Sequence, residues 1–254
     1  MPRLALLLAY DGTAFAGWWR QSELRTVAGE LDAAFARMGE PAAEAVGASR
    51  TDAGVHARGQ TAHVDCSRAW EPAVLARALA RHLPADVVCR GVATVADNWH
   101  AVHAARGKTY RYRLDIAKQP DPFLAPRIAW RPPYAVPLDA LRAAAAHLPG
   151  SHDFSAFARR GEYRDDLACE LSAVTWYDRG DYRICRVRGT RFAYRLVRSL
   201  VGGMIATAQG TVNISDWQAA LTGQDSPAAH QQAPAHGLCL ERVHYATPPA
   251  WITG

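Results

Sequence analysis

The stretch "ASRTDAGVHARGQ", residues 48–60, brings three side chains that could do chemistry close together along the chain. Arg50 precedes Asp52 by two residues, and His56 follows shortly after it. A carboxylate beside a guanidinium stays ionised, because the opposite charge favours its charged form. The alternative is structural, since an aspartate in a loop often bonds the backbone two residues on and closes an Asx-turn. The local pattern leaves both interpretations of Asp52 open, whereas for His56 we favour a turn-stabilising hydrogen bond over direct catalysis.

The two glycines of this stretch also carry information. Gly54 and Gly59 permit either a positive φ or the close approach of another backbone, which a side chain would prevent. We therefore expect a tight turn at Asp52, presented at the end of a short strand, where loops commonly carry function.

A second stretch, "RGKTYRYRLD", interleaves basic and aromatic residues. In a strand, Lys108, Tyr110 and Tyr112 share one face, and the two arginines between the tyrosines and after them share the other. Such a surface is typical of proteins that stack unpaired bases and contact phosphates. An edge strand with solvated arginines is an equally good interpretation of this stretch.

A third stretch, "RVRGTRFAYRLVRSLVGGMIA", predicts a long helix from Arg191 to Ala208. Arg191, Arg195 and Arg198 would then lie on one face, at i, i+4 and i+7. Like charges at this spacing repel by a few tenths of a kcal/mol per pair unless an anion lies opposite. No carboxylate within the helix supplies that anion, so we favour anion binding over a merely solvated face.

The elements that must position these residues follow from hydrophobic periodicity and turn signals. Strands and helices alternate in the first part of the chain, with one helix beginning after Thr26. The predicted strands are Arg3–Tyr10, Ala45–Ala48, Gln60–Cys66, Asp86–Val95, Gly107–Asp115, Leu171–Tyr177, Tyr182–Arg188 and Cys239–Tyr245, and the other predicted helices are Pro72–Leu83, Leu138–Leu148 and Ile214–Leu221.

Six prolines between Gln119 and Pro137 exclude a long helix or a central strand there. We take this segment, 119–137, as the crossing between an N-terminal half, 1–118, and a C-terminal half, 138–254. The fold class predicted is α+β, with two similar halves around a mostly antiparallel sheet. The duplication rests on the order of elements, because no close sequence repeat is visible.

Composition narrows the class of protein. The chain has 254 residues and a formal net charge of +5, with 29 basic residues of which only two are lysines. Guanidinium groups suit bidentate phosphate recognition, although an arginine-rich, alanine-rich composition also arises in GC-rich genomes. The five cysteines are widely spaced without a CxxC pair, which argues against disulfides and a structural zinc site. We expect no metal, no membrane span and a cytoplasmic protein.

Taken together, these stretches resemble the tRNA pseudouridine synthase A family over nearly the whole chain. The segments that carry the resemblance appear in family order: "YDGTAFAGWWRQ", "GASRTDAGVHARGQTAHVD", "KTYRYR", "HDFSAF", "FAYRLVRSLVGGMI" and "AHGLCLERVHY". Two features depart from the family pattern. Trp19 stands where the family usually carries a polar or amide residue, and the segment around residues 158–170 lacks an expected proline-containing stretch. Both departures fall at sites that could shape RNA contacts.

The resemblance implies isomerisation of uridine to pseudouridine at positions 38–40 in the anticodon stem-loop of tRNA, without cofactor or metal. It implies Asp52 as the catalytic aspartate, Tyr110 as the aromatic that packs on the target base, and Arg198 as the ion-pair partner of Asp52. Arg50 would help to hold the flipped nucleotide. The implied fold has a continuous sheet with helices on one side and a basic central cleft, and the implied assembly is a homodimer that shares one tRNA. Further residues expected to contact RNA are Lys108, Arg20, Arg191 and Arg195.

Two other functions use the same residues. A non-catalytic RNA-binding module would leave Asp52 dispensable and bind RNA in a salt-sensitive way. A small-molecule hydrolase would pair Asp52 with His56 as acid and base, without affinity for tRNA. The residues alone support the synthase, the RNA-binding module and the hydrolase about equally, and the resemblance favours the synthase.

Overall fold

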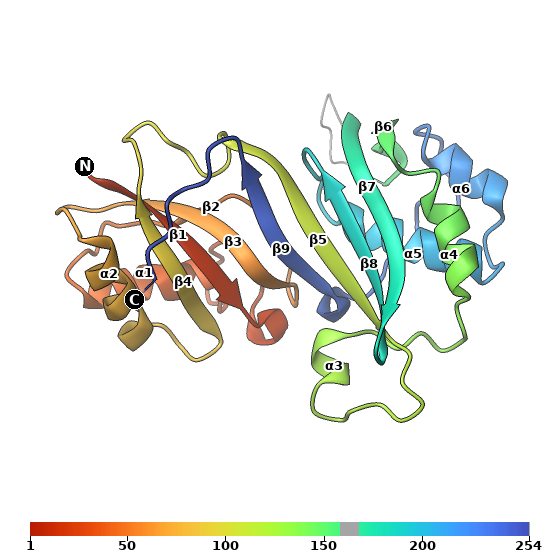
Figure 1. The fold of residues 1–254 in the computed structure, drawn as a ribbon, viewed down its shortest axis with the longest axis horizontal. Helices are drawn as coiled ribbons and strands as arrows, with labels where there is room; N and C mark the ends of the chain where they lie inside the picture. Colours follow the sequence, from red (N-terminus) through yellow and green to blue (C-terminus); the bar gives the residue numbers. More distant parts are fainter. Residues whose placement is uncertain (158–167, 254) are drawn as a thin grey trace. The chain divides into compact units, whose positions relative to one another are not determined.

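The structure is a computed structural model that describes residues 1–157 and 168–253. The chain divides into two compact units, the first comprising Met1–Arg106 with Cys239–Gly254 and the second comprising Gly107–Leu238 (Figure 1). This division differs from the predicted halves, because the C-terminal strand belongs to the first unit and the Pro-rich segment to the second. Each unit combines a largely antiparallel sheet with helices, and the α+β class is confirmed.

The first unit has a mixed sheet in the order β4-β1-β3-β9, and β2 also pairs with β3. All of these pairs are antiparallel except β3 with β9, which run parallel. Because β1 is central and apolar along its length, most of its side chains are buried. The strands are β1 (Arg3–Tyr10), β2 (Val46–Gly47), β3 (His56–Asp65), β4 (Val87–Thr94) and β9 (Leu238–Tyr245).

Two helices of the first unit begin at side-chain caps. Helix α1 (Val27–Arg37) follows Thr26, whose hydroxyl accepts a hydrogen bond from the Gly29 amide at 3.2 Å, as its sequence predicts. Helix α2 (Pro72–His82) follows Glu71, whose carboxylate accepts hydrogen bonds from amides of the first turn. Burial of one apolar face holds each helix on the unit, and the buried residues are Val27, Ala28, Leu31, Ala34 and Phe35 in α1 and Leu75, Ala76 and Leu79 in α2.

The second unit has an antiparallel sheet in the order β5-β8-β7-β6. The predicted hairpin "DRGD" joins β7 to β8 through Gly180 and Asp181. Gly180 has a φ of 57°, as the first central residue of a type II′ turn requires. The strands are β5 (Ala105–Asp115), β6 (Gly150–Asp153), β7 (Ala168–Arg179) and β8 (Tyr182–Gly189).

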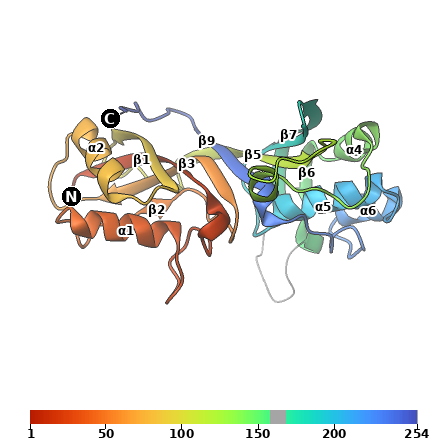
Figure 2. The same cartoon turned by 90° about the horizontal axis from the view of Figure 1, so that it is seen from below.

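Three helices of the second unit, α4, α5 and α6, gather beside β7, where α4 contacts both β7 and α5, and α5 contacts α6 (Figure 2). The Pro-rich segment contains one short helix, which confirms that it forms neither a long helix nor a central strand. No helix in the described part of the chain is long and apolar enough to cross a membrane. The helices are α3 (Ala125–Ile128), α4 (Leu138–Ala145), α5 (Leu196–Ala208) and α6 (Ile214–Ala220), with short 3-10 turns at Gly12–Ala14, Ser155–Phe157 and Ala235–Gly237.

Candidate active site

Asp52 lies in the loop between β2 and β3, at the strand end that its sequence predicts. The Val55 amide donates to the Asp52 carbonyl oxygen at 3.1 Å and closes a four-residue turn. Gly54, the third residue of that turn, has a φ of 77°, which a type II turn requires and which favours glycine. The Asp52 side chain is half-buried. A backbone-closed turn therefore fixes the main chain of the residue that the sequence singles out.

A second loop, between β1 and α1, runs beside the Asp52 turn and braces it. Gly17 forms an antiparallel bridge with Asp52, and the Trp18 amide donates to the Thr51 carbonyl at 3.0 Å. A side chain at Gly17 would bring its Cβ within 2.8 Å of the Thr51 carbonyl oxygen, so only glycine fits this approach. The Thr51 hydroxyl lies 2.8 Å from the buried Tyr10 hydroxyl. The β1–α1 loop and the last residue of β1 thus hold the chain at Thr51 and Asp52.

Strand β3 begins at His56, earlier than the predicted start at Gln60. His56 Nδ1 accepts a hydrogen bond from the Gly12 amide at 3.0 Å and lies 3.2 Å from Asp11 Oδ1, so His56 ties the start of β3 to the β1–α1 loop, and its role beyond that stays a prediction. Gly59 sits where a Cβ would lie 2.3 Å from the Glu241 carbonyl oxygen, so this glycine permits the approach of β9. The strand extends into the motif because β1 and β9 pair with its first residues, a tertiary contact that local periodicity does not register.

Arg50 and Arg20 both lie near the Trp19 ring, but they have different partners. The Arg50 guanidinium carbon is 4.3 Å from the centre of the Trp19 ring, and that of Arg20 is 5.9 Å away. Arg20 binds Asp32 through two nitrogens, and its Nη2 also donates to the Ala45 carbonyl. Arg20 is therefore engaged within the protein, and its role toward RNA stays a prediction. The sequence pattern did not reveal the Arg50–Trp19 contact; its only signal is the doubled tryptophan in "GWWRQ".

Strand β5 presents the predicted aromatic and basic residues of the second unit. Tyr110 is only 7% exposed, and its ring meets Phe192 edge-on at 5.1 Å between centroids. Tyr112 is buried and donates to the Pro234 carbonyl at 2.7 Å, so it is a structural residue whose pKa is raised by burial. Lys108 is half-buried, and burial lowers its pKa because the charged form loses solvation. The face predicted to carry these three residues is thus largely buried.

The prediction that three arginines share one face of a long helix is wrong. Helix α5 begins at Leu196, so Arg191 lies outside it and Arg195 is its N-cap residue, with a left-handed φ of 59°. Arg191 donates to the Ala168 carbonyl at 2.7 and 3.0 Å, and Phe192 packs on the β5 aromatic, contacts that hold this segment out of the helix. Only Arg198 of the three is helical. Periodicity missed the boundary because a positive φ at an arginine leaves no sequence signal.

Arg198 is fixed by a chain segment that packs against α5. Its Nε donates to the Ala233 carbonyl at 2.9 Å, and the Ala233 amide donates to the Arg198 carbonyl at 3.0 Å. This approach depends on Gly202, where a Cβ would lie 2.8 Å from the backbone of Gln231. The helix and the segment therefore hold the arginine by its main chain and by one edge of its guanidinium.

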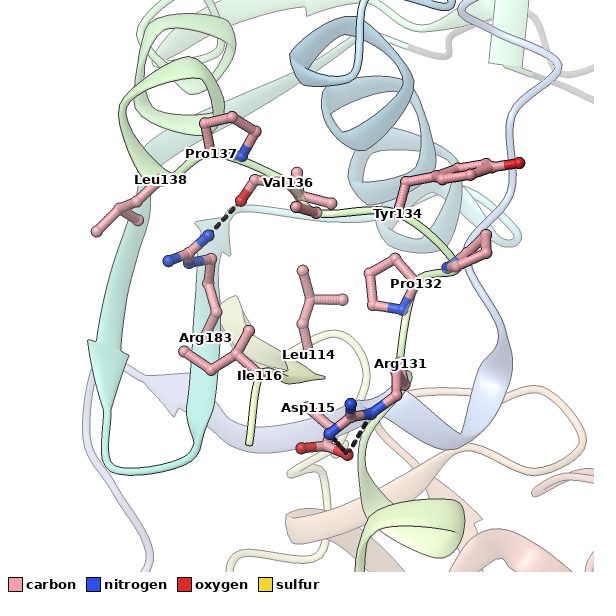
Figure 3. A pocket seen from close by; sticks show the side chains of 12 residues that line it. Leu114, Asp115, Ile116, Arg131, Pro132, Tyr134, Val136, Pro137, Leu138 and Arg183 are labelled. Carbon is pink, nitrogen blue, oxygen red and sulfur yellow. Dashed lines mark hydrogen bonds and ion pairs between the residues drawn. The ribbon is translucent and has the colours of Figure 1, made fainter. Parts of the chain in front are cut away.

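The second unit also contains a cavity of about 810 Å³ that lies beside the Pro-rich segment. Arg131 binds the buried carboxylate of Asp115 at 3.0 Å on one side, and Arg183 donates to the Val136 carbonyl on the other (Figure 3). The exposed ring of Tyr134 stands at its rim. The predicted site residues do not line this cavity.

Among residues 1–157 and 168–253, no group of three or more His, Cys, Asp and Glu side chains could hold a metal ion. The departure from the family pattern predicted near residues 158–170 falls largely on 158–167, which lie outside the described residues.

The α+β fold agrees with the class that the sequence resembles, the pseudouridine synthases. The sequence pattern of a family described as tRNA pseudouridine synthase matches residues 7–103 and 144–246. The chain therefore belongs to this family, whose members are isomerases acting on tRNA.

Curated relatives agree over the full length. The tRNA pseudouridine synthase A of Shouchella clausii is 37% identical over 249 residues, covering 98% of this chain and 95% of the relative. That of Paracoccus denitrificans is 38% identical over 259 residues, covering 98% of both chains. That of Chloroflexus aurantiacus is 37% identical over 259 residues, covering 99% of this chain and 91% of the relative.

Proposed function

We propose that the protein isomerises uridine to pseudouridine at positions 38–40 in the anticodon stem-loop of tRNA, with Asp52 as the catalytic residue. The observation that carries this proposal is the turn at Asp52, which is closed by its own backbone and braced by the β1–α1 loop. Such bracing is what a nucleophile needs, because a small displacement of a reacting group can cost a large factor in rate. The names of the full-length relatives support tRNA as the substrate.

The reaction breaks the C1′–N1 bond of uridine, turns the uracil, and forms a C1′–C5 bond. The proton on C5 leaves and N1 gains one, so the product is an isomer and no redox step occurs. Asp52 must be ionised to attack C1′ or C6, or to remove the 2′ proton and give a glycal. All three paths need the same carboxylate and none needs a cofactor.

Other residues take supporting roles in the proposal. Arg198 is the ion-pair partner that keeps Asp52 charged, and its anchoring by Ala233 suits a guanidinium that must stay in one place. Tyr110 packs on the target base and assists deprotonation at C5, and its edge contact with Phe192 supports a fixed ring. Arg50 helps to hold the nucleotide that has left the stack. Basic residues that contact the RNA more widely are Lys108, Arg20, Arg191 and Arg195.

The proposal includes a homodimer that shares one tRNA between its subunits, and a cytoplasmic location. The homodimer comes from the family resemblance, and the location comes from a sequence in which we expect neither a membrane span nor a signal peptide. Sedimentation of the protein alone and with an unmodified tRNA transcript tests the first. One tRNA per two protein chains is the expected stoichiometry, and one per monomer contradicts it.

The function itself is tested with an unmodified tRNA transcript that carries tritium at C5 of its uridines. The wild-type protein is expected to release tritium to water, and pseudouridine is expected at positions 38–40 when the product is mapped. Tight binding of several tRNAs without release from any of them would instead favour the RNA-binding module.

A further inference from the structure

Trp19 and Arg50 form a stack beside the Asp52 turn. The guanidinium carbon of Arg50 lies 4.3 Å from the centre of the Trp19 ring, a cation–π distance. Trp19 is 44% exposed, and Arg50 is exposed as well. Single exposed apolar side chains are common on protein surfaces, so the guanidinium beside the ring, and not exposure alone, distinguishes Trp19.

The backbone next to Trp19 is held by hydrogen bonds and by the buried ring of Trp18. Trp18, the neighbour of Trp19, is fully buried and donates its amide to the Thr51 carbonyl at 3.0 Å. Its own carbonyl accepts from the Ala28 amide at 3.0 Å, at the start of α1. Trp18 also fills the space that a side chain at Gly47 would need. Trp19 therefore follows a residue, Trp18, that is held in place and that contacts Thr51 just before the Asp52 turn.

The hydrogen-bond donors of Arg50 differ in their partners from those of Arg20, the other arginine near the Trp19 ring. Arg20 is bound by Asp32 through two nitrogens. Within residues 1–157 and 168–253, the Arg50 guanidinium has no hydrogen-bonded or ionic partner. Arg50 is thus oriented by the ring alone, and its five N–H donors can reach a phosphate or a base edge.

We propose that Trp19 and Arg50 form a stacking platform for an unpaired nucleobase next to the target uridine in the same RNA strand. The inference rests on the proposed function and adds a residue that sets the local sequence context of the substrate. Every base has a π-face, and an aromatic ring or a guanidinium plane stacks on it. Gly17 forms a bridge with Asp52, and Trp19 is two residues after Gly17 in the sequence. The platform is therefore next to the residue that the target uridine must reach.

The test measures binding of an anticodon-arm RNA hairpin by the Asp52→Asn variant, so that turnover does not disturb the equilibrium. Each unpaired loop nucleotide is replaced in turn by an abasic nucleotide. One position beside the target is expected to weaken binding about tenfold or more when its base is absent. In the Asp52→Asn, Trp19→Ala protein that penalty is expected to fall below about twofold, whereas Trp19→Phe retains most of it.

Trp70 provides a matched control. It also lies under an arginine, with Arg68 at 4.0 Å from its ring, but it lies outside the two loops of the site. Trp70→Ala is expected to leave the abasic penalty unchanged. Thermal unfolding verifies that each variant is folded, and Trp19→Leu replaces Trp19→Ala if the latter is not.

An abasic penalty that is the same with and without Trp19 overturns the platform. Tritium release by the wild-type protein separates this failure from that of the proposed function. Tritium release together with an abasic penalty that does not depend on Trp19 supports the isomerase and contradicts the platform. A Trp19-dependent penalty without release from any tRNA supports the platform and overturns the isomerase.

Discussion

In the first unit, Asp52 is held where two loops run side by side, and in the second, Arg198 is held where a helix meets an extended segment. The first arrangement depends on Gly17 and Gly54, which allow backbone to approach backbone and allow a positive φ. The second depends on Gly202, which lets the segment before Ala233 reach the helix. Both units therefore fix a side chain of the proposed site through main-chain contacts that only glycine permits.

The difference between the two arrangements lies in the backbone next to each side chain. The Asp52 turn is closed within four residues by its own backbone, and Gly17 of another loop braces it. Arg198 lies in a helix that begins after Arg195, a residue with a positive φ, and its side chain binds Ala233. Gly17 and Ala233 are equally far along the chain from Asp52 and Arg198, so the turn at Asp52 is visible in the sequence and neither long-range contact is.

The largest effect that would sharpen this comparison is expected at Arg198. Arg198→Met keeps the bulk of the side chain but removes the charge and the bond to Ala233, so kcat is expected to fall roughly 100- to 1000-fold. Single-turnover kinetics with tRNA measure it. The control is Arg142→Met, which removes an exposed arginine of the same unit. A fall in tRNA affinity with kcat unchanged would contradict the ion-pair role and make Arg198 an RNA-binding residue.

A smaller effect is expected at Gly17, where stability is measured by urea denaturation. Gly17→Ala forces a positive φ of 114° on a side chain and drives its Cβ against the Thr51 carbonyl, with an expected loss of about 3 kcal/mol. Gly39→Ala is the control, because Gly39 also has a positive φ but open space around it. Its expected loss is about 1 kcal/mol. Equal losses would show that the brace against the Asp52 turn contributes nothing.

The smallest effect is expected in the pH dependence of the first unit. His63 is buried, and burial, followed by the nearby His100 and Arg3, lowers its pKa to about 4. The unfolded chain binds the proton near pH 6.5 while the folded one does not, so stability is full above that pH and falls as the pH drops toward 4. Between pH 7 and pH 5 the expected loss is about 2 kcal/mol.

The contribution of His63 is isolated by the variant His63→Gln, which keeps an acceptor for the Ala101 amide. Urea denaturation at pH 7 and pH 5 is expected to show a smaller pH dependence in the variant than in the wild type. A pH dependence that is the same in both proteins would assign the loss to other groups, such as Asp65 paired with Arg3.

Sequence predicted the fold where the signal is local. The cap at Thr26, the hairpin at Gly180 and the turn at Gly54 follow from the preferences of single residues, and the structure confirms them. Three features could not be predicted from the sequence, because they depend on contacts between residues far apart in the chain. These are the early start of β3 at His56, the late start of α5 at Leu196 and the assignment of the C-terminal strand to the first unit.

The same reasoning applies to the candidate site. The motif identified Asp52 and Arg50, and the structure adds how they are held. The sequence could not reveal that Arg20 binds Asp32 or that Arg50 stacks on Trp19, because the spacing of these residues follows no recognisable pattern.

Asp52→Asn tests the central claim most directly, since it replaces the carboxylate by an amide of the same shape. Tritium release from C5-labelled tRNA is measured in a single turnover with enzyme in excess, and tRNA binding is measured by filter retention. We expect release to fall by roughly 1000-fold or more while binding stays within about tenfold of wild type. Release near the wild-type rate, or loss of binding together with loss of fold, would contradict the assignment and make Asp52 a structural residue of its turn.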